Sequence, residues 1–323
     1  MGYERELEIA IDAVCEAAKL CVDVQASLVT ALEKDDRSPV TVADFGSQAL
    51  VCRRLKEAFP HDPIVGEEDA SALRSAEQAH MRKTVTRFVN NHIAADEETV
   101  CAWIDAGNGS VAERFWTLDP IDGTKGFLRN DQYAVALALI DDGEVQVATL
   151  ACPALPLDLA EPDGQCGMLF VAVRGEGTFY RPLAGGDMLR GQVAGSNDEK
   201  AWRFAESVEA AHGDHDAQKA VAQAVGIISP SLRMDSQAKY GAVARGDAAL
   251  YVRLPSPKYP DYREKIWDHA AGSLVVEEAG GTVSDMFGRP LDFATDALME
   301  DNRGVVVSSS EVHKQVIEAL NGV

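Results

Sequence analysis

Apolar residues recur at helical spacing near the start of the chain and are followed by a polar stretch. The apolar positions lie three to four residues apart, on one helix face: Leu7, Ile11, Val14, Ala18 and Cys21. This spacing predicts an amphipathic helix over roughly the first 25 residues. A polar loop follows at 33–39, and a second helix is expected from near Asp44 to Phe59, just before Pro60.

The pattern changes to strands in the middle of the chain. A short strand is expected at 64–66, then a polar helical stretch at about 70–100 that suits a lid. The apolar run at 115–118 is typical of a buried strand end. Further strands are expected at 133–140 and 145–151, joined at Asp142-Gly143, and at 168–173 and 178–180. These segments predict an antiparallel sheet covered by helices from the first half.

The last third alternates between helical and strand-like patterns, which favours an α/β layer. A helix is expected after Asp214, strands at 227–228 and 249–252, and a helix at 268–279 stopped by Gly280-Gly281. This α/β layer is expected to end with two strands, at 282–283 and 304–307, and a final helix after 310. The glycine-rich stretch 182–195 is the candidate boundary, so we expect domains at 1–190 and 191–323.

Charge narrows the choice of partners. The 323 residues carry a formal net charge of −22, while 46% are hydrophobic and 25% charged, as in ordinary globular proteins. We therefore expect no nucleic-acid and no membrane partner. A phosphorylated small molecule remains possible where metals or a local basic patch reverse the field.

Cysteine spacing and the first residues suggest the compartment. The six cysteines include no CxxC pair, which favours reduced thiols over disulfides or a zinc site. The first residues are charged and lack an apolar signal core, and no stretch approaches ~18 uninterrupted apolar residues. We therefore expect a cytoplasmic, monomeric protein.

The segment Asp119-Pro120-Ile121-Asp122-Gly123-Thr124 carries the most chemical information. Asp119 and Asp122 would normally repel each other, but the proline and glycine can bend the chain so that both enter one small volume. Divalent cations would hold such a cluster together, with the Thr124 hydroxyl beside it, for metal-assisted attack of water on a phosphoester. The alternative is an ordinary turn, in which Asp, Pro and Gly are common.

Three further acidic residues lie at the ends of expected elements. Glu67 follows the strand at 64–66, while Asp44 and Asp268 lie at expected helix starts. Helix capping explains Asp44 or Asp268 taken alone, and a surface carboxylate explains Glu67. Taken together with the Asp119 segment, they predict a magnesium site, because Mg²⁺ prefers oxygen ligands. The oxygens available for two ions ~4 Å apart come from Glu67, Asp119, Asp122, Asp268 and the Ile121 carbonyl.

Several motifs resemble one known family. They are Ile-Val-Gly-Glu-Glu at 64–68, Trp-x-Leu-Asp-Pro-Ile-Asp-Gly-Thr-Lys-Gly-Phe at 116–127, and Trp-Asp-His-Ala-Ala-Gly with Glu-Ala-Gly-Gly within 267–281. These resemble the lithium-sensitive, metal-dependent phosphatases related to inositol monophosphatase. Ser-Pro-Val-Thr at 38–41, Met-Asp-Ser-Gln-Ala-Lys-Tyr at 234–240 and the segment 251–268 are similar to its 3′(2′),5′-bisphosphate nucleotidase branch. The resemblance extends from about residue 4 to about residue 293.

The resemblance implies specific roles. One Mg²⁺ would be held by Glu67, Asp119 and the Ile121 carbonyl, and another by Asp119, Asp122 and Asp268, with two or three ions in all and inhibition by Li⁺. Asp44 and Thr124 would activate the attacking water. The implied substrate contacts are Thr124, His212, Ser236, Lys239, Arg253 and Asp268.

The implied fold is an α-β-α-β-α sandwich of the type found in inositol monophosphatase and fructose-1,6-bisphosphatase. The implied reaction removes the 3′-phosphate of 3′-phosphoadenosine 5′-phosphate, giving AMP and phosphate. The related sulfated nucleotide, 3′-phosphoadenylyl sulfate, is an expected second substrate.

The basic residues make sense independently of the resemblance. If metals bind one phosphate, a second phosphate needs its own counter-charges, which Lys239 and Arg253 can supply beside Ser236. A solvated surface is the alternative for both. His212 and His215 lie close enough in sequence to suggest a metal site. No other His/Cys cluster accompanies them, so a ring stacked on adenine, or a histidine in a loop, is the better interpretation.

Two other functions compete with the nucleotidase. The superfamily motif also fits a phosphatase of inositol phosphates, and relative rates on the two substrate classes would separate them. A non-catalytic nucleotide sensor would predict a broken ligand set. That set is intact at Glu67, Asp119, Asp122, Thr124 and Asp268.

Overall fold

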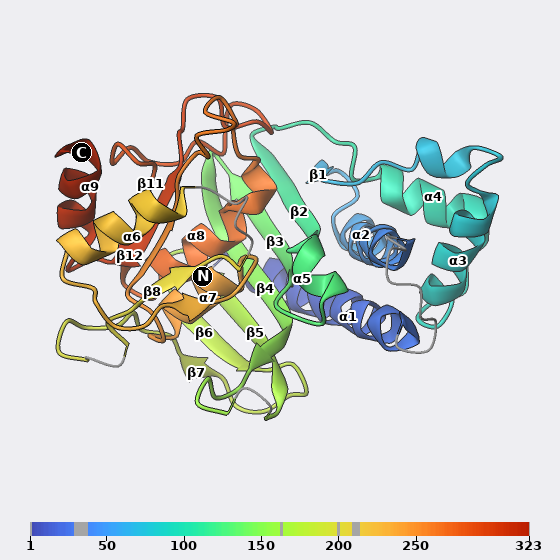
Figure 1. Ribbon diagram of the computed structural model, residues 1–323. Helices are drawn as coiled ribbons and strands as arrows, with labels where there is room; N and C mark the ends of the chain where they lie inside the picture. The colour runs from blue at the N-terminus through green and yellow to red at the C-terminus, as the bar shows by residue number, and fades with distance from the viewer. Residues whose placement is uncertain (1, 29–37, 162–163, 199–200, 209–213, 323) are drawn as a thin grey trace.

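Two sheets alternate with three layers of helices (Figure 1). The computed structural model describes residues 2–28, 38–161, 164–198, 201–208 and 214–322. From one side to the other the layers are α1 with α2, a seven-stranded sheet, α7 with α8, a five-stranded sheet, and α6 with α9. This is the expected α-β-α-β-α sandwich.

The first helical layer consists of α1 (Glu4–Leu28) and α2 (Ser38–Ala58), which pack on each other and on the larger sheet. The expectation that α2 begins near Asp44 is wrong, because the helix begins at Ser38. Proline is tolerated in a first helical turn, where its missing N–H has no partner to lose, so Pro39 does not delay the start. Asp44 consequently lies inside the helix rather than at its cap.

The stretch at 70–100 is helical, as expected, and lies outside α2. It contains η1 (Ala72–Arg74), α3 (Ala79–Val89) and the start of α4 (Glu97–Asp105). Both α3 and α4 contact α2. Its function as a lid stays a prediction.

The seven-stranded sheet runs in sequence order. Its strands are β1 (Ile64–Gly66), β2 (Arg114–Asp122), β3 (Ala134–Asp141), β4 (Glu144–Pro156), β5 (Cys166–Val173), β6 (Gly177–Pro182) and β7 (Leu189–Arg190). The pairs from β2 to β7 are antiparallel, as predicted, and β1 joins β2 in parallel. Asp142 and Gly143 connect β3 to β4 with φ of 53° and 78°, as a tight two-residue hairpin requires.

The five-stranded sheet has the order β11-β12-β10-β8-β9. Its strands are β8 (Phe204–Glu206), β9 (Leu232–Arg233), β10 (Leu250–Arg253), β11 (Gly281–Ser284) and β12 (Val305–Ser309). The expected strand at 227–228 is wrong. Ile227 donates its N–H to the Ala222 carbonyl at 2.9 Å, so that group closes the end of α6 instead of joining a ladder.

The remaining helices cover the smaller sheet or border the pocket described below. They are α5 (Thr124–Leu128), α6 (His215–Ala224), α7 (Ala238–Ala244), η2 (Ile266–Asp268), α8 (Ala270–Glu277) and α9 (His313–Gly322). The helix expected at 268–279 is therefore split into η2 and α8. Gly280 follows α8 with a φ of 89°, in the expected stop.

Apolar side chains fill the spaces between all five layers. Helices α7 and α8 come from the second half of the chain, yet α8 contacts β3, β4 and β5 of the first sheet. The first sheet ends at Arg190, next to the expected boundary at 190/191, but two separate domains stay a prediction. All six cysteines are free thiols. Among the described helices, none is long and apolar enough to span a bilayer.

Candidate metal and phosphate site

The end of β2 brings Asp119 and Asp122 to one side of the sheet. Along a regular strand, residues three apart point to opposite faces. Here Asp119 pairs with Ala136 and Asp122 with Ala134, so three steps on β2 oppose two on β3. This irregularity lets both carboxylates face the same pocket. Gly123, with a φ of 92°, then turns the chain into α5.

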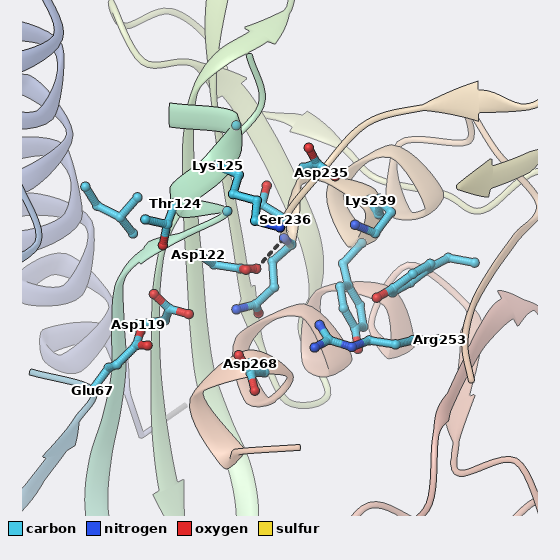
Figure 2. Close-up of a pocket in the computed structure, with 16 residues that line it drawn as sticks. Glu67, Asp119, Asp122, Thr124, Lys125, Asp235, Ser236, Lys239, Arg253 and Asp268 are labelled. Atoms are coloured by element: carbon cyan, nitrogen blue, oxygen red, sulfur yellow. Dashed lines mark hydrogen bonds between the residues drawn. The ribbon is translucent and has the colours of Figure 1, made fainter. Parts of the chain in front are cut away.

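A pocket of about 260 Å³ opens at this point, between the two sheets' ends (Figure 2). It is lined by residues from β1–β2, α5, α7, β10 and η2: Glu67, Asp119, Ile121, Asp122, Gly123, Thr124, Lys125, Gly126, Asp235, Ser236, Gln237, Lys239, Tyr240, Tyr251, Arg253 and Asp268. We call the carboxylates Glu67, Asp119, Asp122 and Asp268 the acidic wall. We call Ser236, Lys239 and Arg253 the basic wall. Figure 2 shows Lys239 and Arg253 across the pocket from Glu67 and Asp119.

The acidic wall concentrates negative charge. One carboxylate oxygen from each of Asp119, Asp122 and Asp268 lies within 4.8 Å of the others. Burial and then Glu67 raise the pKa of Asp119 well above its usual range. Burial and then Asp268 raise the pKa of Asp122 to about 6 and that of Glu67 to about 7. Such shifts mean that the wall resists full ionisation by itself.

The donor set of the acidic wall fits magnesium. Asp119 is 2% exposed, and its Oδ1 atom is buried without a hydrogen-bond partner among the described residues. A buried, unpartnered carboxylate oxygen is costly unless it is paired or ligates a cation. All donors here are oxygens, the ligand type that Mg²⁺ prefers, and the Ile121 residue lines the same pocket. The residues present therefore suit a divalent hard cation.

Asp268 reaches the wall from the far side of the pocket. It is the last residue of η2, and its Oδ2 accepts a hydrogen bond from the Lys265 N–H at 3.0 Å. The sequence interpretation of Asp268 as the N-cap of a helix is wrong, because Lys265 is the N-cap of η2 and His269 that of α8. Asp268 instead bonds back to the Lys265 N–H from the third position of η2, and the same carboxylate also joins the cluster. This hydrogen bond and metal ligation are compatible because a carboxylate has two oxygens.

Asp44 and Thr124 lie on neighbouring elements, since α2 contacts α5. Thr124 is exposed in the pocket at the start of α5. Asp44 is 8% exposed and does not line the pocket itself. Burial, then Glu68 and Glu67, raise the pKa of Asp44 well above its usual range. Its carboxyl group is therefore buried within the electrostatic influence of Glu68 and Glu67.

The basic wall is buried more deeply than surface cations usually are. Lys239 is 3% exposed, and its Nζ lies 5.0 Å from the centre of the Tyr251 ring. Burial lowers the pKa of Lys239 to about 8, although Asp122 and Asp235 oppose the shift. Ser236 precedes it with a φ of 66°, a strained backbone for a residue with a side chain. The solvated-surface interpretation of Lys239 is wrong.

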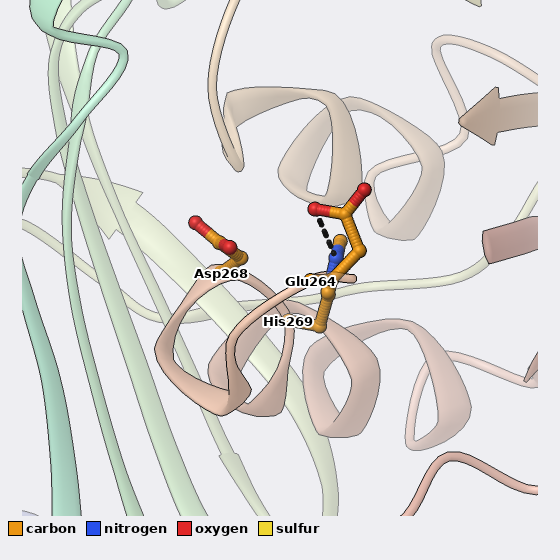
Figure 3. Close-up of side chains that lie close together, drawn as sticks. All are labelled: Glu264, Asp268 and His269. Carbon is orange, nitrogen blue, oxygen red and sulfur yellow. Dashed lines mark ion pairs between the residues drawn. The ribbon is translucent and has the colours of Figure 1, made fainter. Parts of the chain in front are cut away.

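Arg253 is supported from behind by a carboxylate. Its Nε donates to Glu264 at 2.9 Å, and Glu264 raises the pKa of the guanidinium against the effect of burial. Glu264 lies 3.5 Å from His269 (Figure 3). The other ring nitrogen of His269 is 2.7 Å from the Tyr240 hydroxyl. Glu264, Asp268 and His269 are close enough to suggest a second metal site, but the bonded guanidinium makes a cation there unfavourable.

The structure gathers most residues that the sequence singled out. Glu67, Asp119, Ile121, Asp122, Thr124, Ser236, Lys239, Arg253 and Asp268 all line one pocket. Asp44 is adjacent to it, and His212 lies outside the described residues.

Sequence reasoning assigned no role to several other lining residues: Lys125, Asp235, Gln237, Tyr240 and Tyr251. Each lies inside a quoted motif, so proximity to those motifs was the available signal. Asp235 is buried and accepts hydrogen bonds from Arg129 and from the Val208 N–H. It therefore joins the α5 loop to the strand region of the smaller sheet.

The comparisons with known proteins agree with this geometry. The model of the inositol monophosphatase family matches residues 3–323. A protein of Schizosaccharomyces pombe named 3′(2′),5′-bisphosphate nucleotidase is 43% identical over 343 aligned residues, which cover 100% of this chain and 97% of that protein. One of the same name from Emericella nidulans is 42% identical, covering 100% and 99%.

Solved structures of low identity share the fold. Inositol monophosphatase from Anabaena superposes with a TM-score of 0.61 at 18% identity, covering 100% of this chain and 98% of that one. CysQ from Bacteroides thetaiotaomicron, a bacterial member of the inositol monophosphatase family, gives 0.61 at 18%, covering 96% and 98%.

Proposed function

Because the chain belongs to the inositol monophosphatase family, we propose that it is a Mg²⁺-dependent 3′(2′),5′-bisphosphate nucleotidase. It removes the 3′-phosphate of 3′-phosphoadenosine 5′-phosphate and releases AMP and phosphate. Relatives that carry this name are 38–43% identical over nearly the whole chain, with the rice protein at 41% among them.

The observation that carries the proposal is the pairing of two walls in one pocket. A carboxylate cluster suits cations that bind the phosphate to be removed. Lys239 and Arg253 lie opposite, at a distance from that cluster, and suit a second anionic group. A substrate with two phosphates matches this division of charge better than a substrate with one.

Each residue then has a defined task. Glu67, Asp119 and the Ile121 carbonyl would hold one Mg²⁺, and Asp119, Asp122 and Asp268 another. The bound ions would polarise the phosphoryl oxygens and lower the pKa of a water molecule. Thr124 orients that water through its exposed hydroxyl, and the buried Asp44 accepts a proton from this side of the pocket.

The nucleotide lies along the basic wall in this proposal. Arg253 and Lys239 bind the phosphate that is not removed, Ser236 donates a hydrogen bond, and Thr124 and Asp268 border the reacting phosphate. His212 completes the substrate contacts, by the family resemblance. We also propose 3′-phosphoadenylyl sulfate as a second substrate, Li⁺ as an inhibitor at one metal position, and a monomeric, cytoplasmic protein.

A phosphate-release assay tests the function directly. Equal concentrations of 3′-phosphoadenosine 5′-phosphate, AMP, inositol 1,4-bisphosphate and inositol 1-phosphate are compared with Mg²⁺ and with a chelator. We expect the fastest release from the adenosine bisphosphate, with AMP as the product, and none with chelator. Faster release from an inositol phosphate would replace the proposal with an inositol phosphatase.

Lithium inhibition provides a separate test of the metal positions. With limiting Mg²⁺, added LiCl should reduce turnover, while KCl at the same ionic strength serves as the control. Equal rates in the two salts would contradict competition by Li⁺ at a metal position.

A further inference from the structure

Two buried glutamine side chains adjoin the acidic wall, Gln48 outside the pocket and Gln237 in its lining. Gln48 on α2 is 0% exposed and Gln237 before α7 is 1% exposed. Neither is charged, so neither would ligate Mg²⁺ as readily as the carboxylates beside them. Most of their side-chain hydrogen bonds are directed at the segments that carry those carboxylates.

Gln237 connects ligands that come from different sheets. Its backbone N–H donates to Asp122 Oδ2 at 2.5 Å. Its side-chain Nε2 donates to the Trp267 carbonyl at 2.9 Å, and its Oε1 accepts from the Gly272 N–H at 3.1 Å. Trp267 and Gly272 flank Asp268 on either side in sequence. One residue thus fixes Asp122 and the turn of Asp268 relative to each other.

Gln48 holds the segment at the Glu67 end of the acidic wall. Its Oε1 accepts from the Glu68 N–H at 3.0 Å, and its Nε2 donates to the Glu68 carbonyl at 2.5 Å. The same Nε2 also donates to the Ile104 carbonyl at the end of α4, at 2.9 Å. Gln48 therefore holds both backbone groups of the residue that directly follows Glu67.

The surrounding backbone leaves room for this amide and for little else. A β-carbon at Gly66 would lie 2.6 Å from Gln48 Oε1, and one at Gly107 would lie 2.5 Å from its Nε2. Gly66 and Gly107 are themselves joined by a hydrogen bond of 2.8 Å. The amide is thus enclosed between two glycine backbones, which keeps its orientation fixed.

We propose that Gln48 and Gln237 are positioning residues of the metal site, each for a different ion. Gln48 sets the place of Glu67, and Gln237 sets the separation of Asp122 and Asp268. Asp119, on the rigid strand β2, is common to both ions and needs no such support. This inference rests on the proposed metal-dependent function and adds residues that act through the ligands, not on the substrate.

The test measures metal binding without turnover. Mn²⁺ is titrated by calorimetry into the wild type, Gln48→Met and Gln237→Met. Methionine keeps a similar volume but makes none of the side-chain amide hydrogen bonds, while the backbone N–H of residue 237 still donates to Asp122. Partners behind metal ligands are typically worth 10–100-fold in affinity. We expect each variant to lose about tenfold or more at one site, while the other site keeps wild-type affinity.

Asn302→Leu is the matched control. Asn302 is 6% exposed, and its amide also bridges two backbone groups. Its Oδ1 accepts a hydrogen bond from the Asp292 N–H at 2.7 Å, and its Nδ2 donates to the Pro290 carbonyl at 2.9 Å. It lines no part of the pocket. Its loss should lower thermal stability without changing either Mn²⁺ affinity, which separates a positioning effect from general destabilisation.

The possible outcomes separate the metal site from the positioning role of the two glutamines. Wild-type protein that binds no Mn²⁺ would refute the metal site itself, and with it the proposed function. Wild-type binding with unchanged affinities in both glutamine variants would refute only the positioning role. If a methionine variant does not fold, Gln48→Asn or Gln237→Asn replaces it. Each keeps an uncharged amide but is one methylene shorter, so it cannot reach the same backbone groups and should lose affinity at the same site.

Discussion

The acidic and basic walls of the pocket differ in where their counter-charges come from. On the acidic wall, each carboxylate raises the pKa of its neighbours, as Glu67 does for Asp119 and Asp268 does for Asp122. On the basic wall, Glu264 neutralises Arg253 from behind, at 2.9 Å. The counter-charge of the basic wall therefore comes from the protein itself, whereas the acidic wall needs bound cations as its counter-charge.

This difference has a functional meaning. A wall that is already neutralised from behind offers directed hydrogen bonds to an anion at little cost in repulsion. A wall of mutually repelling carboxylates gains stability only when a cation arrives. Substitutions at either wall test this difference, and their expected effects differ in size.

The largest effect is expected from Asp119→Asn. Asparagine has the same shape, but it removes the one carboxylate that both proposed ions share. Metal ions supply several kcal/mol of transition-state stabilisation, so turnover should fall by about a thousandfold or more. Steady-state rates at saturating Mg²⁺ measure this, with thermal unfolding as the check on folding. Full activity in a folded variant would contradict the metal role.

Arg253→Ala should have the next largest effect, and on binding rather than turnover. Hydrogen bonds to charged groups are worth about 1.5–3 kcal/mol, or roughly 10–100-fold in KM. The rise should appear with 3′-phosphoadenosine 5′-phosphate and be much smaller with 3′-AMP, which lacks the second phosphate. An equal rise for both substrates would place Arg253 elsewhere in the mechanism.

Glu264→Gln should act in the opposite direction to Arg253→Ala, and more weakly. Glutamine still accepts the hydrogen bond from Arg253, yet it no longer neutralises the guanidinium charge, which therefore attracts the substrate phosphate more strongly. We expect KM for the bisphosphate to fall by up to about tenfold, with kcat nearly unchanged. Glu144→Gln, at an exposed ion pair of 3.6 Å with Arg174, is the control and should leave KM unaltered. A fall in kcat alone would argue against a binding role.

The smallest effect concerns stability and pH in the metal-free protein. The pKa of Asp122 is raised to about 6 and that of Glu67 to about 7, so the folded state binds more protons than the unfolded chain. Their stabilising contribution is present at low pH and is lost as pH rises through those values. The melting temperature with chelator should fall by about 2–4 °C between about pH 5.5 and pH 7.5.

Saturating Mg²⁺ should remove that fall, because the ions replace the protons as counter-charges. Asp122→Asn should also flatten the dependence in chelator, since it deletes one of the shifted groups. Identical pH profiles for the wild type and Asp122→Asn, both without metal, would show that these carboxylates do not control the change.

Much of the fold was predictable because its strands carry strong local signals. The hairpin at Asp142-Gly143 and the helix stop at Gly280 depend on backbone preferences that sequence shows directly. The start of α2 was not predictable, since a proline near a helix start is compatible with a helix that begins at Ser38 or near Asp44. The strand expected at 227–228 failed because two apolar residues do not reveal that one N–H closes a helix.

The site shows the same limit. Carboxylates that follow expected strands and helices could be placed together by their chemistry. Gln48 could not, because a buried amide leaves no periodic or charge signal, and its partner Ile104 lies far away in sequence. Gln237 was indicated only by its place in the 234–240 motif, which does not reveal its distant partner Gly272. Glu264 was likewise hidden, since only the fold shows that it faces Arg253.

Crystals grown with Mn²⁺ and AMP test the central claim most directly, because Mn²⁺ is visible by its anomalous scattering. The account predicts at least two peaks in the pocket, both within coordination distance of Asp119, one shared with Glu67 and the other with Asp122 and Asp268. It also predicts the nucleotide phosphate beside Arg253. An ordered pocket without anomalous peaks among these carboxylates, at saturating Mn²⁺, would contradict it.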